Sequence, residues 1–120
     1  MVDVVVMRRG SGWVVVAVAG EVDFRSADSL YDQALRLMDG DAGCLVLDFS
    51  QVAFCDSSGI SALVGIMREL RARGGGLIVA AAPDRVTRAM RQMGMHHFIP
   101  VHDSVATALD TLPGPGADVP

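Results

Sequence analysis

Strand-like and helix-like apolar segments alternate along this sequence, and that alternation limits the folds it can adopt. Two β-branched runs near the start flank a glycine-containing turn and predict a hairpin. Later apolar runs are each followed by apolar residues at helical spacing. The expected strands are 2–7, 13–19, 44–49, 77–82 and 98–101, and the expected helical stripes are 27–38, 60–70, 86–93 and 105–112. The order ββαβαβαβα predicts one α/β domain with a mixed, mostly parallel sheet, right-handed crossovers and helices packed on it.

The composition fits one domain and lacks the clustered basic residues of a nucleic-acid-binding surface. The chain has 120 residues, of which 51% are hydrophobic, enough for a core. We expect the domain to span 1–112 and the Pro- and Gly-rich segment 113–120 to be a flexible C-terminal tail. The net charge is −4, lysine is absent and the arginines are scattered. Direct binding of DNA or RNA is therefore not expected.

The sequence also predicts a cytoplasmic protein with no membrane partner. Arg8 and Arg9 interrupt the first apolar run, and no run reaches the roughly 18 apolar residues of a membrane span. Cys44 and Cys55 should then be reduced. Cys44 is expected in the core, and the charge of Asp56 should raise the thiol pKa of Cys55, which argues against a nucleophile.

Polar segments follow three of the expected strands. Parallel strands place their carboxyl ends at one edge of a sheet, where open α/β sheets usually bind their ligands. We therefore expect segments 20–25, 50–57 and 82–84 to converge at that edge.

Asp56, Ser57, Ser58 and Gly59 form the most informative segment, at a predicted strand-to-helix junction. A structural interpretation is available, because Asp and Ser commonly cap helices and Gly permits close packing. A functional one follows from position, since backbone N–H groups at a helix N-terminus favour an anion. A phosphate on Ser57 would add roughly −1.5 to −2 charges beside Asp56 and repel a partner without refolding the domain.

Four motifs in the right order give the chain a resemblance to a known family. Gly20–Asp23 follows the second strand, Asp56–Gly59 follows the third, Arg71–Gly76 ends a helix, and Met93–Phe98 precedes a short strand. With these motifs the chain, from Val4 to about Leu112, resembles the STAS-domain anti-sigma factor antagonists.

The resemblance implies a mechanism and its residues. Ser57 would be the phosphorylated serine, and the partner surface would comprise Asp23, Asp56, Ser57, Ser58 and Gly59. The unphosphorylated chain would bind an anti-sigma factor serine kinase and so release a sigma factor. Phosphorylation would end binding, and a serine phosphatase would reset the chain. ATP and Mg²⁺ would belong to the kinase, so this chain is expected to be no enzyme, with no catalytic residues, cofactor or metal of its own.

Several residues have alternative interpretations. Ser58 is favoured as a helix-capping hydroxyl over a second phosphoacceptor. Asp23 could contact the partner or satisfy donors within its own loop; the resemblance favours contact. Ser26 is expected to cap the first helix. His96, His97 and His102 lack the spacing of a zinc site.

Two other functions remain open. The first is a STAS-like scaffold that is not phosphorylated and serves a stress-signalling or lipid-transport assembly. The second is a small enzyme, but Ser57 lacks a Gly-x-Ser-x-Gly elbow and has no evident histidine partner.

Overall fold

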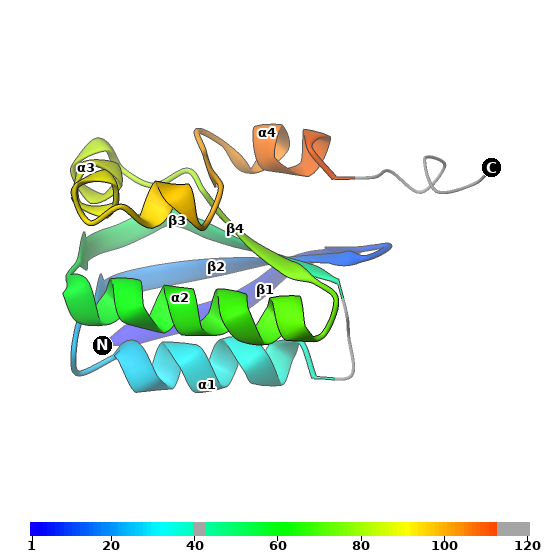
Figure 1. The fold of residues 1–120 in the computed structure, drawn as a ribbon, viewed down its shortest axis with the longest axis horizontal. Helices are drawn as coiled ribbons and strands as arrows, with labels where there is room; N and C mark the ends of the chain where they lie inside the picture. Colours follow the sequence, from blue (N-terminus) through cyan, green and yellow to red (C-terminus); the bar gives the residue numbers. More distant parts are fainter. Residues whose placement is uncertain (40–42, 113–120) are drawn as a thin grey trace.

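The computed structural model describes residues 1–39 and 43–112, so the predicted tail 113–120 lies outside the described residues. The predicted order of strands and helices is confirmed, with one short 3₁₀ helix added (Figure 1). None of the described helices is long and apolar enough to cross a membrane. The elements are β1 (Val2–Gly10), β2 (Trp13–Val22), α1 (Ala27–Leu37), β3 (Cys44–Cys55), α2 (Ser57–Ala72), β4 (Gly76–Ala80), α3 (Asp84–Gln92), η1 (Met95–His97), β5 (Val101–His102) and α4 (Val105–Asp110).

The sheet is mixed and mostly parallel, as predicted. Its five strands lie in the order β1-β2-β3-β4-β5. Among the described strands, only β1 and β2 are antiparallel, because a tight turn joins them, whereas a helix connects each later pair of neighbours.

The central strands are buried on both faces, which explains their continuous apolar runs. Val14, Leu45 and Leu47 belong to the larger core cluster, which also contains residues of α1 and α2. Their neighbours Val15 and Val46 belong to a second cluster with residues of α4. Figure 1 shows α1 and α2 side by side on one face of the sheet and α4 on the other.

β2 and β3 extend further than predicted. Residues 20–22 and 50–55, which were expected to lie in polar connections, continue the two strands, which pair as far as Val22 and Cys55, whereas residues 23–25 form a loop as predicted. The apolar pattern is lost there because polar side chains face solvent, but the backbone groups still need partners. Gly20 permits this extension: its φ is +107°, and a Cβ atom would overlap the carbonyl of Met1.

The segment after α3 also differs from the prediction. Met93, predicted to face the core, is 42% exposed, because α3 ends at Gln92 and the chain turns at Gly94, where φ is +75°. Phe98 was expected to open a strand but is exposed, and Ile99 enters the core in its place. The strand itself is reduced to the two residues of β5.

Two of the three strand ends predicted to converge do meet. The backbone N–H of Asp56 donates to the carbonyl of Val22 at 3.2 Å. β4, however, ends at Ala80 opposite Asp48, well before β3 ends. The segment 82–84 therefore lies beside the middle of β3, and α3 packs against β3 there.

We predict that Phe49→Ala will lower the free energy of unfolding by about 3–5 kcal/mol, because this side chain is fully buried in the core. Urea denaturation measures the change. Phe54→Ala is the matched control on the same strand, since Phe54 is 50% exposed, and it should cost far less. Equal losses for the two variants would contradict the assignment of the core.

Candidate functional site

The candidate site begins where β3 passes into α2. Asp56 has an extended backbone, with φ −101° and ψ −173°, and its Oδ1 accepts a hydrogen bond from the Gly59 N–H at 3.0 Å. This bond satisfies one of the free donors of the first helical turn. The predicted helix start is confirmed, but the capping side chain is that of Asp56, and the capping role predicted for Ser58 was wrong.

Gly59 lets the first turn of α2 pack directly on the end of β2. A Cβ atom at this position would overlap the carbonyl oxygen of Val22 and would lie 2.8 Å from its side chain and 2.9 Å from the sulfur of Cys55. Since real Cβ atoms avoid such contacts, any larger residue would push the helix away from the strand. The close packing expected at Gly59 is confirmed.

Ser57 is the first residue of α2, and its side chain is exposed. Across residues 1–39 and 43–112, its hydroxyl has no hydrogen-bond partner. Ser58, one position on, is half-buried. Of the two hydroxyls, that of Ser57 is therefore the more accessible from solvent.

The loop that follows β2 is held by its own side chains. Oδ1 of Asp23 accepts hydrogen bonds from the N–H groups of Arg25 and Ser26, at 3.0 and 3.2 Å. The Ser26 hydroxyl donates to the carbonyl of Glu21 at 2.6 Å and accepts from the Asp23 N–H at 3.0 Å. Ser26 is the N-cap residue of α1, as predicted, but its side chain does not cap the helix, because its buried hydroxyl is occupied within this loop.

These hydrogen bonds also set the charge of Asp23. Partial desolvation acts to raise its pKa, but the backbone donors of Arg25 and Ser26, with the Ser26 hydroxyl, outweigh it and hold the pKa of Asp23 below its usual value of 3.8. Asp23 therefore remains ionised at neutral pH. The loop-stabilising role left open for this residue is present in the structure.

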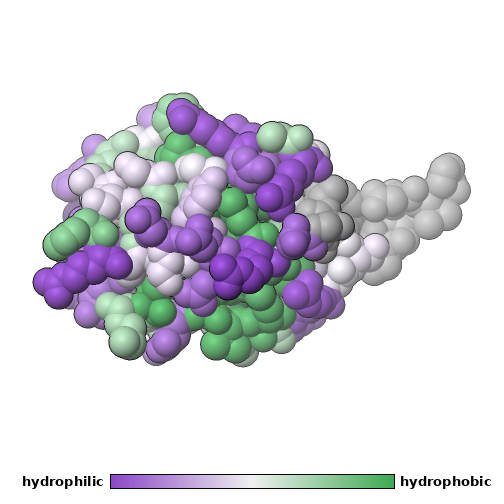
Figure 2. Space-filling model, turned by 90° about the horizontal axis from the view of Figure 1, so that it is seen from below, coloured by the Kyte–Doolittle hydropathy of each residue, from purple (hydrophilic) through white to green (hydrophobic). Residues whose placement is uncertain are grey.

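Two exposed aromatic side chains flank these polar groups. Phe24 is 70% exposed in the loop after β2, and Phe54 is 50% exposed on β3, opposite Glu21. Phe24 also lines an open groove of about 390 Å³ between α1 and α2, together with Ser58 and Ser61. Figure 2 views this helical side of the molecule and shows apolar patches interrupted by polar side chains.

Sequence reasoning missed both aromatics. Segment 50–55 lacks a continuous apolar run and reads as a loop, so the sequence alone gives no strand alternation that would place Phe54 on the surface. Phe24 lies in a polar stretch without periodicity. An aromatic residue isolated among charged residues after a strand was the available signal.

The two cysteines are not activated. Burial raises the thiol pKa of Cys55 to about 12, with the charge of Asp56 adding to the effect. Burial likewise raises the pKa of Cys44 to about 11. The predicted effect of Asp56 on Cys55 is confirmed, although burial is the larger cause. Both groups are neutral thiols at pH 7.

The structure thus brings all the predicted site residues to one edge of the sheet. Asp23 follows the end of β2, and Asp56, Ser57, Ser58 and Gly59 follow the adjoining end of β3. A family model described as the STAS domain matches residues 5–108. The chain belongs to the STAS domain family. The resemblance carried by the four sequence motifs is confirmed.

Relatives of this STAS domain include anti-sigma factor antagonists. It is 26% identical over 109 residues to the anti-sigma F factor antagonist of Paenibacillus polymyxa, covering 88% of this chain and 92% of the relative. The crystal structure of an anti-sigma factor antagonist from Mycobacterium paratuberculosis superimposes with a TM-score of 0.80 and 26% identity, covering 92% and 93% of the two chains.

The same fold is found in SpoIIAA, which is described as an anti-sigma factor antagonist. Its unphosphorylated form gives a TM-score of 0.74 at 22% identity, covering 91% of this STAS domain and 95% of SpoIIAA. The phosphorylated form of Bacillus SpoIIAA gives 0.66 at 21% identity, covering 91% and 98%. The predicted α/β fold is therefore that of known STAS domains.

We predict that Asp56→Ala will destabilise this STAS domain by about 1 kcal/mol, because the Gly59 N–H loses its acceptor. Asp56→Asn keeps an oxygen in the same place and should cost much less. Urea denaturation of both variants at neutral pH separates the effect of the cap from that of the charge. A loss equal in both would show that the charge, and not the hydrogen bond, matters.

Asp23→Asn should make folding less sensitive to acid. The lowered pKa means that the Asp23 carboxylate stabilises the fold fully above the unfolded-state pKa, near 3.8. That contribution is lost as the pH falls from the unfolded-state pKa down through the lower pKa of the folded state. The urea midpoint of the wild type should fall more steeply than that of Asp23→Asn from about pH 5 to about pH 3. Parallel curves would contradict the prediction.

Proposed function

We propose that this STAS domain is an anti-sigma factor antagonist that is switched by phosphorylation of Ser57. The unphosphorylated domain binds an anti-sigma factor serine kinase and so releases a sigma factor. Phosphorylation ends this binding, and a serine phosphatase restores it. The observation that carries the proposal is the exposed hydroxyl of Ser57 at the first position of α2, which forms no hydrogen bond to the described part of the chain.

The position of Ser57 suits a phosphoacceptor. The partner kinase would transfer the γ-phosphoryl group of ATP to Oγ of Ser57: a new O–P bond forms, the bond to the β-phosphate oxygen breaks, ADP leaves, and the hydroxyl proton passes to a base of the kinase. ATP and Mg²⁺ are supplied by the kinase. This chain contributes an accessible nucleophile and no catalysis of its own.

The fold tolerates the added charge for a local reason. The cap of α2 is provided by Asp56 through Gly59, so it does not depend on the Ser57 hydroxyl. A phosphate at the first position of α2 also lies at the positive end of the helix dipole. We therefore expect the modified domain to keep its structure and to change mainly at its surface.

That surface is where a partner would sense the phosphate. Phe24 and Phe54 offer exposed apolar area close to the carboxylates of Asp23 and Asp56. A partner that covers the two aromatic side chains must also desolvate the polar groups beside them. Adding roughly −1.5 to −2 charges at Ser57 makes this step costly and places negative charge beside two carboxylates.

The relatives support this proposal. The relatives from Paenibacillus polymyxa and Mycobacterium paratuberculosis are named as anti-sigma factor antagonists, and SpoIIAA has been solved in both unphosphorylated and phosphorylated forms. In that protein the two forms share the fold to which this chain is similar.

We predict that Ser57→Asp will weaken binding to the partner kinase at least about tenfold, equivalent to about 1.4 kcal/mol. Ser57→Ala should bind like the wild type and should not be released when ATP is added. Ser11→Asp, which adds the same charge at an exposed turn, is the matched control and should bind normally. Calorimetric titration against the purified kinase measures all three. If both Ser57 variants behave like the wild type, the switch lies elsewhere.

Mass spectrometry after incubation with kinase and ATP tests the acceptor itself. Phosphate should appear on Ser57 in the wild type and in Ser58→Ala, and should be absent from Ser57→Ala. Recovery of a transporter or scaffold subunit from cell extracts, with no phosphate on either serine, would instead support a scaffold role in a stress-signalling or lipid-transport assembly.

A further inference from the structure

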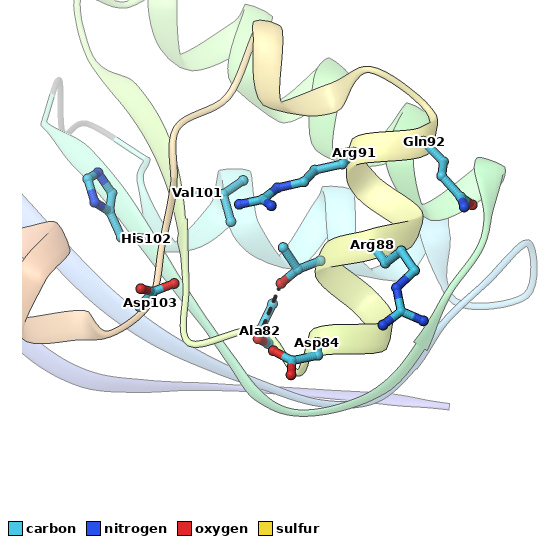
Figure 3. Close-up of a pocket in the computed structure, with 9 residues that line it drawn as sticks. Ala82, Asp84, Arg88, Arg91, Gln92, Val101, His102 and Asp103 are labelled. Carbon is cyan, nitrogen blue, oxygen red and sulfur yellow. Dashed lines mark hydrogen bonds between the residues drawn. The ribbon is translucent and has the colours of Figure 1, made fainter.

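A second hollow lies between α3 and β5 and has no lining residue in common with the Ser57 site. Its volume is about 640 Å³. Figure 3 shows its polar lining: Arg88 and Arg91 project from α3, Asp84 lies at the start of that helix, and Asp103 follows β5. A volume of roughly 300–1,000 Å³ is typical of sites for small organic ligands.

The two arginines give the hollow its main chemical feature. Arg88 and Arg91 are three positions apart on α3 and therefore lie on the same side of the helix. In Figure 3 the Arg91 side chain extends across the hollow toward Val101. Neither guanidinium forms an ion pair within the described ranges 1–39 and 43–112, although Asp84 is one helical turn from Arg88. In the same view the Arg88 side chain points away from that of Arg91, although both residues line the hollow. Two arginines without ion pairs in one lining favour an oxyanion with several acceptor oxygens.

The wall of the hollow is held by defined contacts. The Thr87 hydroxyl donates to the carbonyl of Ala82 at 3.3 Å, which joins α3 to the segment after β4 (Figure 3). The Ala81 N–H donates to the carbonyl of His102 at 2.9 Å. Ala81 adopts a left-handed backbone, with φ +61°, which alanine rarely accepts. The fold thus maintains an unfavourable backbone conformation where the chain enters the hollow.

The carboxylates narrow the class of ligand. Asp84 and Asp103 line the same hollow as the two arginines, so a bare anion would meet negative as well as positive charge. Carboxylates accept hydrogen bonds from hydroxyl groups. A ligand with one anionic end and several hydroxyls satisfies both sets of groups, and 640 Å³ is more room than an inorganic phosphate needs.

We propose that this hollow binds a small phosphate monoester that carries hydroxyl groups, such as a sugar phosphate. Arg88 and Arg91 hold the phosphate oxygens, and Asp84 and Asp103 accept from the hydroxyls. The site is separate from Ser57, so it does not depend on the function proposed above.

The test uses the unphosphorylated full chain, labelled with ¹⁵N, and three probes: ribose 5-phosphate, ribose and inorganic phosphate. Ribose 5-phosphate should produce saturable shifts of the amides of α3 and residues 101–103 and of the side-chain Nε signals of Arg88 and Arg91. Inorganic phosphate should bind at least about tenfold more weakly, and ribose should cause no saturable shift, because each probe lacks one half of the interactions.

Variants on one helix provide the control. Arg88→Gln and Arg91→Gln should each weaken binding of ribose 5-phosphate at least about tenfold, the loss expected when a charge-assisted contact is removed. Arg85→Gln removes the same charge from an exposed position of α3 outside the hollow and should leave affinity within about twofold. All three positions are exposed, so the variants should fold.

Three results would overturn the proposal. The first is the absence of saturable shifts with ribose 5-phosphate at concentrations up to about 10 mM. Such a result would mean that the dissociation constant lies well above the millimolar range. The second is equal weakening by Arg85→Gln and Arg91→Gln, which would show only diffuse attraction to a basic helix. The third is inorganic phosphate binding as tightly as the ester, which would remove the role of the hydroxyl groups.

Discussion

The parallel pairing of β2 with β3, continued to the last residue of both strands, is the constraint on which the candidate site depends. It places Val22 beside Cys55 and lets the Asp56 N–H donate to the Val22 carbonyl. Gly59 then packs on that same carbonyl. The loop after β2 and the first turn of α2 are therefore fixed relative to each other by backbone contacts, and the side chains that could meet a partner occupy a rigid platform.

Neighbouring residues of this site have different roles. The carboxylate of Asp56 caps α2. The carboxylate of Asp23 and the hydroxyl of Ser26 form the hydrogen bonds that close the loop after β2. Ser57 has no such structural task in the described chain. A change in the charge of Ser57 can therefore alter recognition while the hydrogen bonds that hold the site remain intact.

Local patterns were sufficient to predict the order of the elements, the mixed sheet and the start of α2. Runs of buried residues and the Asp-Ser-Ser-Gly junction carry that information within a few positions. The ends of β2 (20–22) and β3 (50–55) were missed because most of their side chains face water. Only Val22, Val52 and Cys55 are buried there, so no continuous apolar run marks the paired backbone. The roles of Ser26 and Ser58 were misjudged for a related reason: which hydroxyl caps a helix depends on acceptors elsewhere in the fold, such as the Glu21 carbonyl. Likewise, Met93 lies outside the core because the turn at Gly94 ends the helix first.

The unequal lengths of β3 and β4 have a consequence for solubility. Beyond Asp48, β3 has β2 on one side and, among residues 1–39 and 43–112, no strand on the other, so its backbone there is open to pairing with a strand from another molecule. α3 packs against this part of β3, with Val86 and Met90 buried beneath it. The helix thus protects this edge from pairing with another molecule, and fraying of α3 would expose backbone groups that favour aggregation.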